Sequence, residues 1–135
     1  MIIKIPGTPI AKKRPRFARI GKGVRTYSIQ ETEEGRTLLM IKDQVREQTD
    51  KPVKVSFFFK LPRPKNHFGS GKNAEQLKAS APKHHTSKPD IDNMVKFYMD
   101  CLNGIVWHDD RQVVIQEASK MYHDEPETVI IVNEL

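Results

Sequence analysis

The stretch KPDIDNMVKFYMDCLNGIVWHDD, residues 88–110, decides the fold because it combines a regular apolar pattern with two pairs of aspartates. Five apolar residues recur in it at helical spacing: Ile91, Met94, Val95, Tyr98 and Leu102. The Asn103-Gly104 pair that follows is typical of a left-handed C-cap. We therefore predict a helix over residues 91–102 that buries one face, followed by a reversal of the chain.

The patterns on either side of this helix predict a small α+β domain. Alternating or β-branched runs predict four strands, at about residues 2–5, 53–61, 113–122 and 128–134. A further amphipathic helix is predicted at about 29–48. The order is then β-α-β-α-β-β, a mixed or antiparallel sheet of about four strands with two main helices, in a single domain of residues 1–135. His123 to Glu127 is predicted to be a hairpin connection between the last two strands.

Two segments between these elements are basic and rich in turn-forming residues. Residues 12–25 contain seven Lys or Arg and no acid, with a proline and glycines that disfavour regular structure. This segment is predicted to be a flexible or extended basic arm. Residues 62–88 are predicted to be a long polar loop, which in a compact domain is usually functional or disordered. Nine basic residues of these segments are candidates for binding a polyanion such as DNA: Lys12, Lys13, Arg14, Arg16, Arg19, Lys22, Arg25, Lys83 and Lys88. The arm could also be a generic solvated surface or a localisation signal.

The charge is divided unevenly along the chain. Residues 1–88 contain 20 Lys or Arg against 7 Asp or Glu, whereas residues 89–135 contain 3 against 10. A surface with this much positive charge attracts polyanions, of which nucleic acid is the commonest inside cells. The acidic part of the chain therefore needs a separate explanation.

The composition argues against several classes of protein. The 135 residues include a single cysteine, Cys101, which excludes an internal disulfide and a zinc site built on paired cysteines. The N-terminus does not resemble a signal peptide, and no run approaches the ~18 apolar residues of a membrane span. We expect a cytoplasmic, intracellular protein with no membrane segment and no small-molecule cofactor.

The first aspartate pair has a simple structural interpretation. Asp90 lies at the predicted start of the helix, and Asp92, Lys96 and Asp100 lie along one polar edge of it. Asp90 and Asp92 would then only cap the helix, while Lys96 would pair with Asp92 and Asp100 at i,i+4 spacing.

The second pair, Asp109 and Asp110, suggests a different interpretation. The reversal after the helix allows one or both of these residues to approach Asp90 and Asp92. Carboxylates gathered in this way repel one another unless a cation separates them. Mg²⁺ prefers carboxylate oxygens and is often shared with a substrate phosphate, so an acidic pocket in a basic protein indicates phosphodiester hydrolysis.

The longer run KPDIDNMVKFYMDCLNGIVWHDDRQVV, residues 88–114, resembles a known family. Its D-x-D-N-x-x-K helix followed by W-x-D-D-x-Q-V is similar to the signature of the RusA family of Holliday junction resolvases. The resemblance is strong over residues 88–120 and loose over the N-terminal part. It implies a homodimeric endonuclease that depends on Mg²⁺, with Mn²⁺ as a possible substitute. Its substrate would be four-way branched DNA, resolved by paired symmetric nicks in recombination and repair.

The resemblance also implies roles for individual residues. Asp90, Asp92 and Asp110 would be metal-binding catalytic carboxylates, Lys96 the essential lysine, and Asp109 an adjacent metal ligand. Pro89 stands where family members often have a basic residue, and the 62–88 loop resembles an insertion. These departures concern junction selectivity and sequence preference at the cut, not the metal chemistry.

Two other functions remain open at this stage. The chain could be a non-catalytic nucleic-acid-binding protein whose acids only cap a helix and dock against the arm, or a metal nuclease for flaps or other branched DNA. Phe57, Phe58 and Phe59 are candidate dimer contacts, although adjacent residues of a strand point to alternate faces and are more often core. Trp107 is predicted to pack beside the aspartates. Glu117 is expected to be an exposed strand residue.

A transition-metal site is not favoured. Four histidines are candidates for one: His67, His84, His85 and His108. They include no i,i+4 helical pair and have no cysteine partner.

Overall fold

The computed structural model describes residues 1–13, 16–20, 23–27 and 30–135, with the backbone alone for the two short middle ranges. Eight helices and strands follow one another in these ranges: β1 (Ile2–Pro6), β2 (Arg16–Ile20), β3 (Gly23–Tyr27), α1 (Glu31–Gln44), β4 (Val53–Leu61), α2 (Ile91–Leu102), β5 (Val113–Tyr122) and β6 (Glu127–Glu134). Three single 3₁₀ turns accompany them: η1 (Lys65–His67), η2 (Gly71–Asn73) and η3 (Asp110–Gln112). None of the helices formed by these residues has the length and apolar character needed to cross a membrane.

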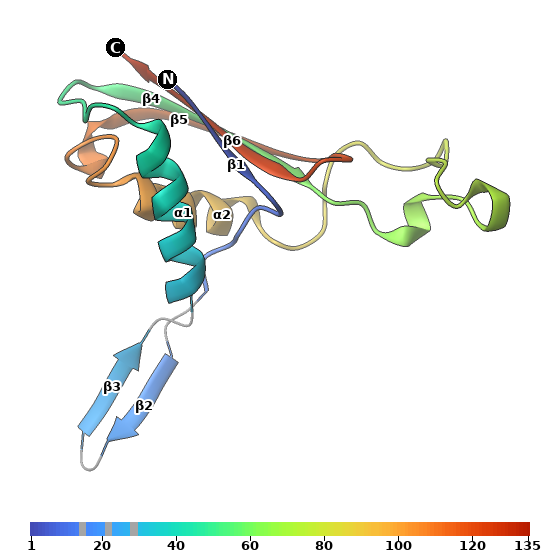
Figure 1. Ribbon diagram of the computed structural model, residues 1–135, viewed down its shortest axis with the longest axis horizontal. Helices are drawn as coiled ribbons and strands as arrows, with labels where there is room; N and C mark the ends of the chain where they lie inside the picture. The colour runs from blue at the N-terminus through green and yellow to red at the C-terminus, as the bar shows by residue number, and fades with distance from the viewer. Residues whose placement is uncertain (14–15, 21–22, 28–29) are drawn as a thin grey trace.

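The main sheet has four strands in the order β1-β6-β4-β5, with both helices on one of its faces (Figure 1). Strand β6 is antiparallel to β1 and β4, whereas β5 is parallel to β4. The predicted mixed α+β domain with four strands and two helices is therefore confirmed. The predicted hairpin between the last two strands is wrong, because β4 lies between β5 and β6. Their connection passes the end of β4, where the His123 N–H donates to the Leu61 carbonyl at 2.9 Å.

The core lies between the helix-facing side of the sheet and α2. Every second residue of β4 is buried there, including Phe57 and Phe59, which are 1% and 0% exposed. The Phe59 ring lies 5.7 Å from the ring of Tyr98 on α2. Full burial of a large apolar side chain contributes roughly 1.5–3 kcal/mol. Cys101 is also buried, and this burial raises the pKa of its thiol to about 12.

The basic arm is more ordered than predicted. Strands β2 and β3 pair antiparallel, with Arg16 opposite Tyr27 and Ile20 opposite Gly23, and form a ribbon that projects from the body (Figure 1). The expectation of no regular structure is therefore wrong. Gly23, one of the glycines that suggested it, pairs with Ile20 within the ribbon.

The loop from 62 to 88 projects from another part of the body and is held by its own hydrogen bonds (Figure 1). Gly69 N–H donates to the Gln76 carbonyl and Lys78 N–H donates to the His67 carbonyl, both at 2.9 Å. Gly69 is required by space, because a Cβ there would lie 2.6 Å from the Asn73 carbonyl oxygen. At the base of the loop, three side chains surround Tyr122 of β5: Arg63, His67 and His85.

Candidate active site

A pocket of about 510 Å³ lies between α2 and the edge strand β5. Its polar lining consists of five side chains: Asp92, Lys96, Asp100, Asp110 and Gln116. Asp92, Lys96 and Asp100 come from the polar edge of α2, whose opposite face is buried in the core. The amphipathic pattern of this helix therefore places these three charges in the pocket.

The simple interpretation of the first aspartate pair is not supported. Asp90 occupies the N-cap position of α2, but its side chain accepts no capping hydrogen bond. Among the described residues, neither Asp92 nor Lys96 forms an ion pair or a side-chain hydrogen bond, and Asp100 pairs with Lys12 instead. The local structure thus leaves the carboxylates of Asp90 and Asp92 and the Lys96 ammonium available for other partners.

Asp110 reaches the pocket through the predicted chain reversal. Gly104 has a φ of +81°, which favours glycine, and its N–H donates to the Trp107 carbonyl at 2.9 Å. The buried Trp107 then donates its indole N–H to Asp110 Oδ1 at 3.0 Å. The predicted packing of Trp107 beside the aspartates is confirmed, and this hydrogen bond orients the Asp110 carboxylate.

Asp109 is used differently from Asp110. Its Oδ1 accepts the Arg111 N–H at 2.9 Å, and its own N–H donates to Gln112 Oε1 at 3.0 Å. Asp109 and Gln112 therefore form a capping box on η3. The hydrogen bond from the Arg111 N–H lowers the pKa of the Asp109 carboxyl below its ordinary value. Gln112 also donates to the carbonyls of Thr49 and Lys51, which fixes the η3 turn to the body.

Asp90 lies just outside the pocket. It lines a second hollow of about 340 Å³ together with Lys88, Pro89 and Asn93. The structure therefore brings Asp92, Lys96 and Asp110 to one pocket, places Asp90 in a second hollow at the start of α2, and uses Asp109 to support the turn.

Comparison with known proteins identifies the family. The family model described as "Endodeoxyribonuclease RusA" matches residues 6–133, which is nearly the whole chain. The protein belongs to the RusA endodeoxyribonuclease family. A Bacillus subtilis (strain 168) protein described as "Uncharacterized protein YqaN" is 32% identical over 132 residues, which cover 96% of this chain and 92% of that protein. Membership in the RusA family indicates endodeoxyribonuclease activity.

The acidic side chains of this RusA-family pocket fit a hard divalent cation only in part. The described residues contain no group of three or more His, Cys, Asp or Glu side chains placed to hold a metal by themselves. Mg²⁺ needs fewer protein ligands than this, because it keeps several waters and often binds one or two carboxylates together with substrate phosphates. Asp92 and Asp110 meet that requirement in chemistry and in number.

The sequence did not reveal two residues of the pocket, Asp100 and Gln116, as lining residues. A signal for Gln116 was present in the strand pattern. Alternate residues of a strand share a face, so Gln116 lies on the same face of β5 as the buried Tyr122. Glu117 points to the opposite face, where it pairs with Lys54 at 3.3 Å. Its expected place as an exposed strand residue is confirmed.

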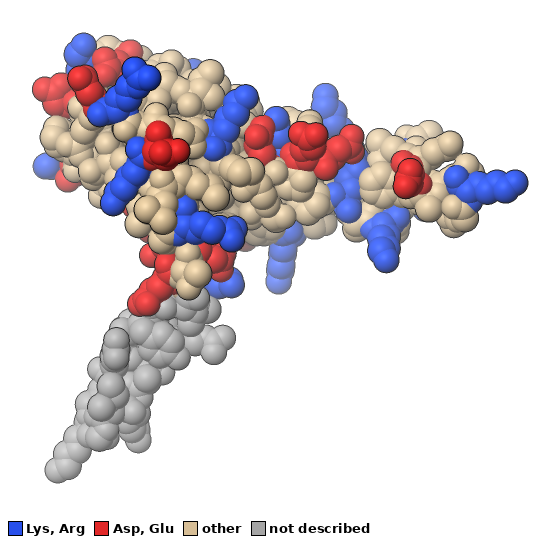
Figure 2. Space-filling model, in the orientation of Figure 1, with Lys and Arg blue, Asp and Glu red and all other residues tan. Residues whose placement is uncertain are grey.

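The predicted DNA-binding residues have several environments. Lys13, Lys83 and Lys88 are exposed, and basic side chains lie along the loop that projects to the right in Figure 2. Three of the arginines belong to β2 and β3: Arg16, Arg19 and Arg25. Arg14 and Lys22 lie outside the described residues. The Lys12 ammonium lies close to two carboxylates, those of Glu34 and Asp100.

Proposed function

We propose that this protein is a divalent-metal-dependent endodeoxyribonuclease that resolves four-way DNA junctions by paired symmetric nicks in recombination and repair. The observation that carries the proposal is that Asp92, Lys96 and Asp110 line one pocket in a chain of the RusA family. Carboxylates that pair with no basic side chain among the described residues suit a cation, and the excess of Lys and Arg in residues 1–88 suits a polyanionic substrate.

Each polar group of the pocket has a role in this proposal. Asp92 and Asp110 would hold Mg²⁺ or Mn²⁺, with Asp90 as a further ligand from the start of α2; Asp109 is the weakest ligand candidate because the backbone already uses its carboxylate. When bound, the ion supplies Lewis acidity, which polarises the scissile phosphate and acidifies water. The Lys96 ammonium offsets the negative charge that develops on the phosphate as water attacks in line and the 3′ oxygen leaves.

The two projections would hold the DNA. Lys and Arg side chains of the arm and of the loop contact backbone phosphates, which position the duplex without reading its bases. Loop residues beyond the nine DNA-binding candidates contribute to this surface, among them the exposed Lys65, Lys72 and Lys78. Binding is therefore expected to weaken steeply with salt concentration.

A homodimer is part of the proposal, because a four-way junction presents two equivalent strands and a two-fold dimer presents two pockets. Of the three candidate interface residues, Phe57 and Phe59 are buried in the core. Phe58 is 38% exposed on the sheet face opposite the helices and remains the candidate. Sedimentation equilibrium of the protein and of Phe58→Lys would test the dimer, which the substitution should weaken.

The function is tested by cleavage of four labelled substrates: a mobile four-way junction, a fork, a flap and a linear duplex. We expect symmetric paired nicks in the junction in Mg²⁺ or Mn²⁺, and none in EDTA or with Asp92→Asn. Preferred cutting of the flap would instead support a flap nuclease. Binding without cleavage of any substrate in either metal would support a non-catalytic binding protein.

A further inference from the structure

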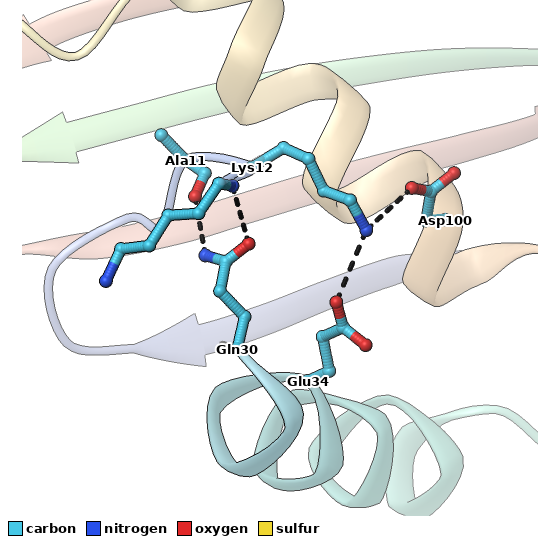
Figure 3. A network of polar contacts seen from close by, with 6 residues as sticks. Ala11, Lys12, Gln30, Glu34 and Asp100 are labelled. Atoms are coloured by element: carbon cyan, nitrogen blue, oxygen red, sulfur yellow. Dashed lines mark hydrogen bonds and ion pairs between the residues drawn. The ribbon is translucent and has the colours of Figure 1, made fainter. Parts of the chain in front are cut away.

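The two ends of the basic arm are joined at its root by one buried side chain, Gln30, which is 1% exposed (Figure 3). Its Nε2 donates to the Ala11 carbonyl at 2.7 Å, and its Oε1 accepts the Lys13 N–H at 2.6 Å. The amide thus pairs with the backbone of the segment that leads into the arm, as a backbone peptide would. Because Gln30 immediately precedes α1, the arm's return end and α1 are fixed together.

The outgoing end of the arm is fastened to α2. Ile10 N–H donates to the Tyr98 hydroxyl at 3.0 Å, and Lys12 N–H donates to the Asn93 carbonyl at 2.9 Å. Asn93 follows Asp92 directly, so this contact lies next to the pocket. The root of the arm is therefore attached to the helix that carries Asp92 and Lys96.

The Lys12 side chain connects the two helices. Its Nζ lies 3.3 Å from Glu34 Oε1 on α1 and 3.2 Å from Asp100 Oδ2 on α2 (Figure 3). Partial burial alone would lower the pKa of the Lys12 ammonium, but its hydrogen bonds to Asp100 and Glu34 outweigh this and raise the pKa above its ordinary value. The charge of Lys12 is thus already paired with carboxylates of the protein, although the amino-acid sequence predicted that this residue binds DNA.

Lys13 provides the contrast. Its Nζ lies 3.5 Å from Glu33, and the two side chains are 54% and 40% exposed, so this single pair is weak and readily exchanged for a phosphate. Lys12 has two carboxylate partners at shorter distances, and one of them, Asp100, lines the pocket. The two neighbouring lysines therefore have different roles.

We propose that Lys12 is a positioning residue, which links the basic arm to α1 and α2. DNA held by the arm then presents one and the same phosphodiester to the pocket of Asp92, Lys96 and Asp110. This inference rests on the proposed nuclease function. It follows from the bridge because loss of the Lys12 side chain leaves Glu34 and Asp100 uncompensated and removes the link between α1 and α2 at the arm's root, although the backbone hydrogen bonds of Ile10 and Lys12 remain. Misplacement of a substrate by about 1 Å can reduce a rate by as much as ~100-fold.

The test compares four variants on a fixed four-way junction: Lys12→Met, Lys12→Arg, Lys13→Met and Lys42→Met. Three quantities are measured: the single-turnover rate at saturating DNA, the Kd as a function of salt, and the positions of the cuts. For Lys12→Met we expect a rate at least about tenfold lower and cuts spread to neighbouring phosphodiesters. Its Kd and salt dependence should change little. Lys12→Arg should restore the rate and the single cut position, since a guanidinium can bridge both carboxylates.

The other two variants are the controls. Lys13→Met should weaken binding and reduce the slope of log Kd against log salt concentration by about one, as expected for the loss of one phosphate contact. The position of the cut should not change. Lys42→Met, on the exposed surface of α1, should resemble the wild type in all three measurements. Thermal melting shows whether each variant is folded; Glu34→Gln, which removes one partner of Lys12, replaces Lys12→Met if the latter unfolds.

Two results would overturn the inference. One is a Lys12→Met protein that cuts at the wild-type position and rate but binds DNA more weakly with a smaller salt dependence, since Lys12 would then be a phosphate contact. The other is a double variant, Lys12→Met with Asp100→Asn, that cuts at the wild-type rate and position. Lys12 would then act only by neutralising the charge of Asp100 and not by positioning the arm. Failure of the wild type to cut any junction counts instead against the proposed function.

Discussion

The two aspartate pairs differ in how far the backbone around them uses their carboxylates. Asp90 and Asp92 stand at the start of α2, where carboxylates commonly cap, yet neither is bound to the helix N-terminus. Asp109 and Asp110 stand on a single 3₁₀ turn, which engages Asp109 in a capping box and leaves Asp110 to the Trp107 indole and the pocket. The longer helix thus keeps both carboxylates available, while the short turn needs one for its own stability.

This difference shows why adjacent acids in one motif are not equivalent. A 3₁₀ turn of three residues has few internal hydrogen bonds, so a side-chain acceptor contributes much of its order. An α-helix of twelve residues is supported by its buried face instead. We therefore expect the four aspartates to separate by experiment into residues that act in cleavage and one that acts in folding.

The largest effect is expected for the first pair. Asp90→Asn and Asp92→Asn should each reduce the single-turnover cleavage rate by about 100-fold or more, because each removes charge where a cation and a developing anion must be stabilised. Junction binding, measured by fluorescence anisotropy, should be retained. If Asp90 were instead a cap, Asp90→Ala would lower the free energy of unfolding by about 1 kcal/mol and leave cleavage intact.

The second pair is expected to divide. Asp110→Asn should lose cleavage about as strongly as Asp92→Asn, whereas Asp109→Ala should lose less than about tenfold, because Asp109 acts through the η3 turn. Asp109→Ala should instead lower the melting temperature. Equal loss of cleavage in the two variants, with equal stability, would show that the comparison of Asp109 with Asp110 is mistaken.

A smaller effect is expected from the group that orients Asp110. Trp107→Phe keeps an aromatic ring in the core but removes the N–H that donates to Asp110 Oδ1. We expect the cleavage rate to fall by about tenfold, in line with the low end of a hydrogen bond to a charged group. Phe97→Leu, a change in the same core away from Asp110, serves as the control for lost packing. If the cleavage rates of Trp107→Phe and Phe97→Leu fell only in proportion to their loss of stability, an orienting role for Trp107 would be excluded.

The smallest effect concerns pH. The Arg111 N–H lowers the pKa of the Asp109 carboxyl from its ordinary value of 3.8. The stability that this contributes is present above the ordinary value and is lost as the pH falls through the lowered one. Melting temperatures of the wild type and Asp109→Ala should therefore converge as the pH is reduced below 3.8. A difference that stays constant at all pH values would exclude this origin.

Local patterns predicted the elements of the fold well. The helix predicted over residues 91–102 and the strands predicted over 53–61 and 113–122 have the bounds of α2, β4 and β5. The first helix is shorter than its predicted range of 29–48, and one of its leucines, Leu39, is 70% exposed. Where one face of an element packs on a continuous core, periodicity is enough to define it.

Long-range pairing could not be predicted in the same way. The four residues between β5 and β6 have the composition of a hairpin, but the partner of each strand is β4, whose residues are more than fifty positions away from those of β5. The pairing of β2 with β3 was not predicted for a related reason, since it depends on the backbone groups of one strand meeting those of the other. Turn composition reports where a chain bends and not which strand it then joins.

By itself, the sequence determined the amphipathic helix α2, the basic and acidic division of the chain, and the presence of Asp90, Asp92, Lys96 and Asp110 near one another along the chain. These follow from residue type and spacing, which are local properties. Only the tertiary structure decided that Asp110 rather than Asp109 lines the pocket, and that Lys12 joins Glu34 and Asp100. Both depend on where side chains from separate elements meet, and that is set by packing around a shared core.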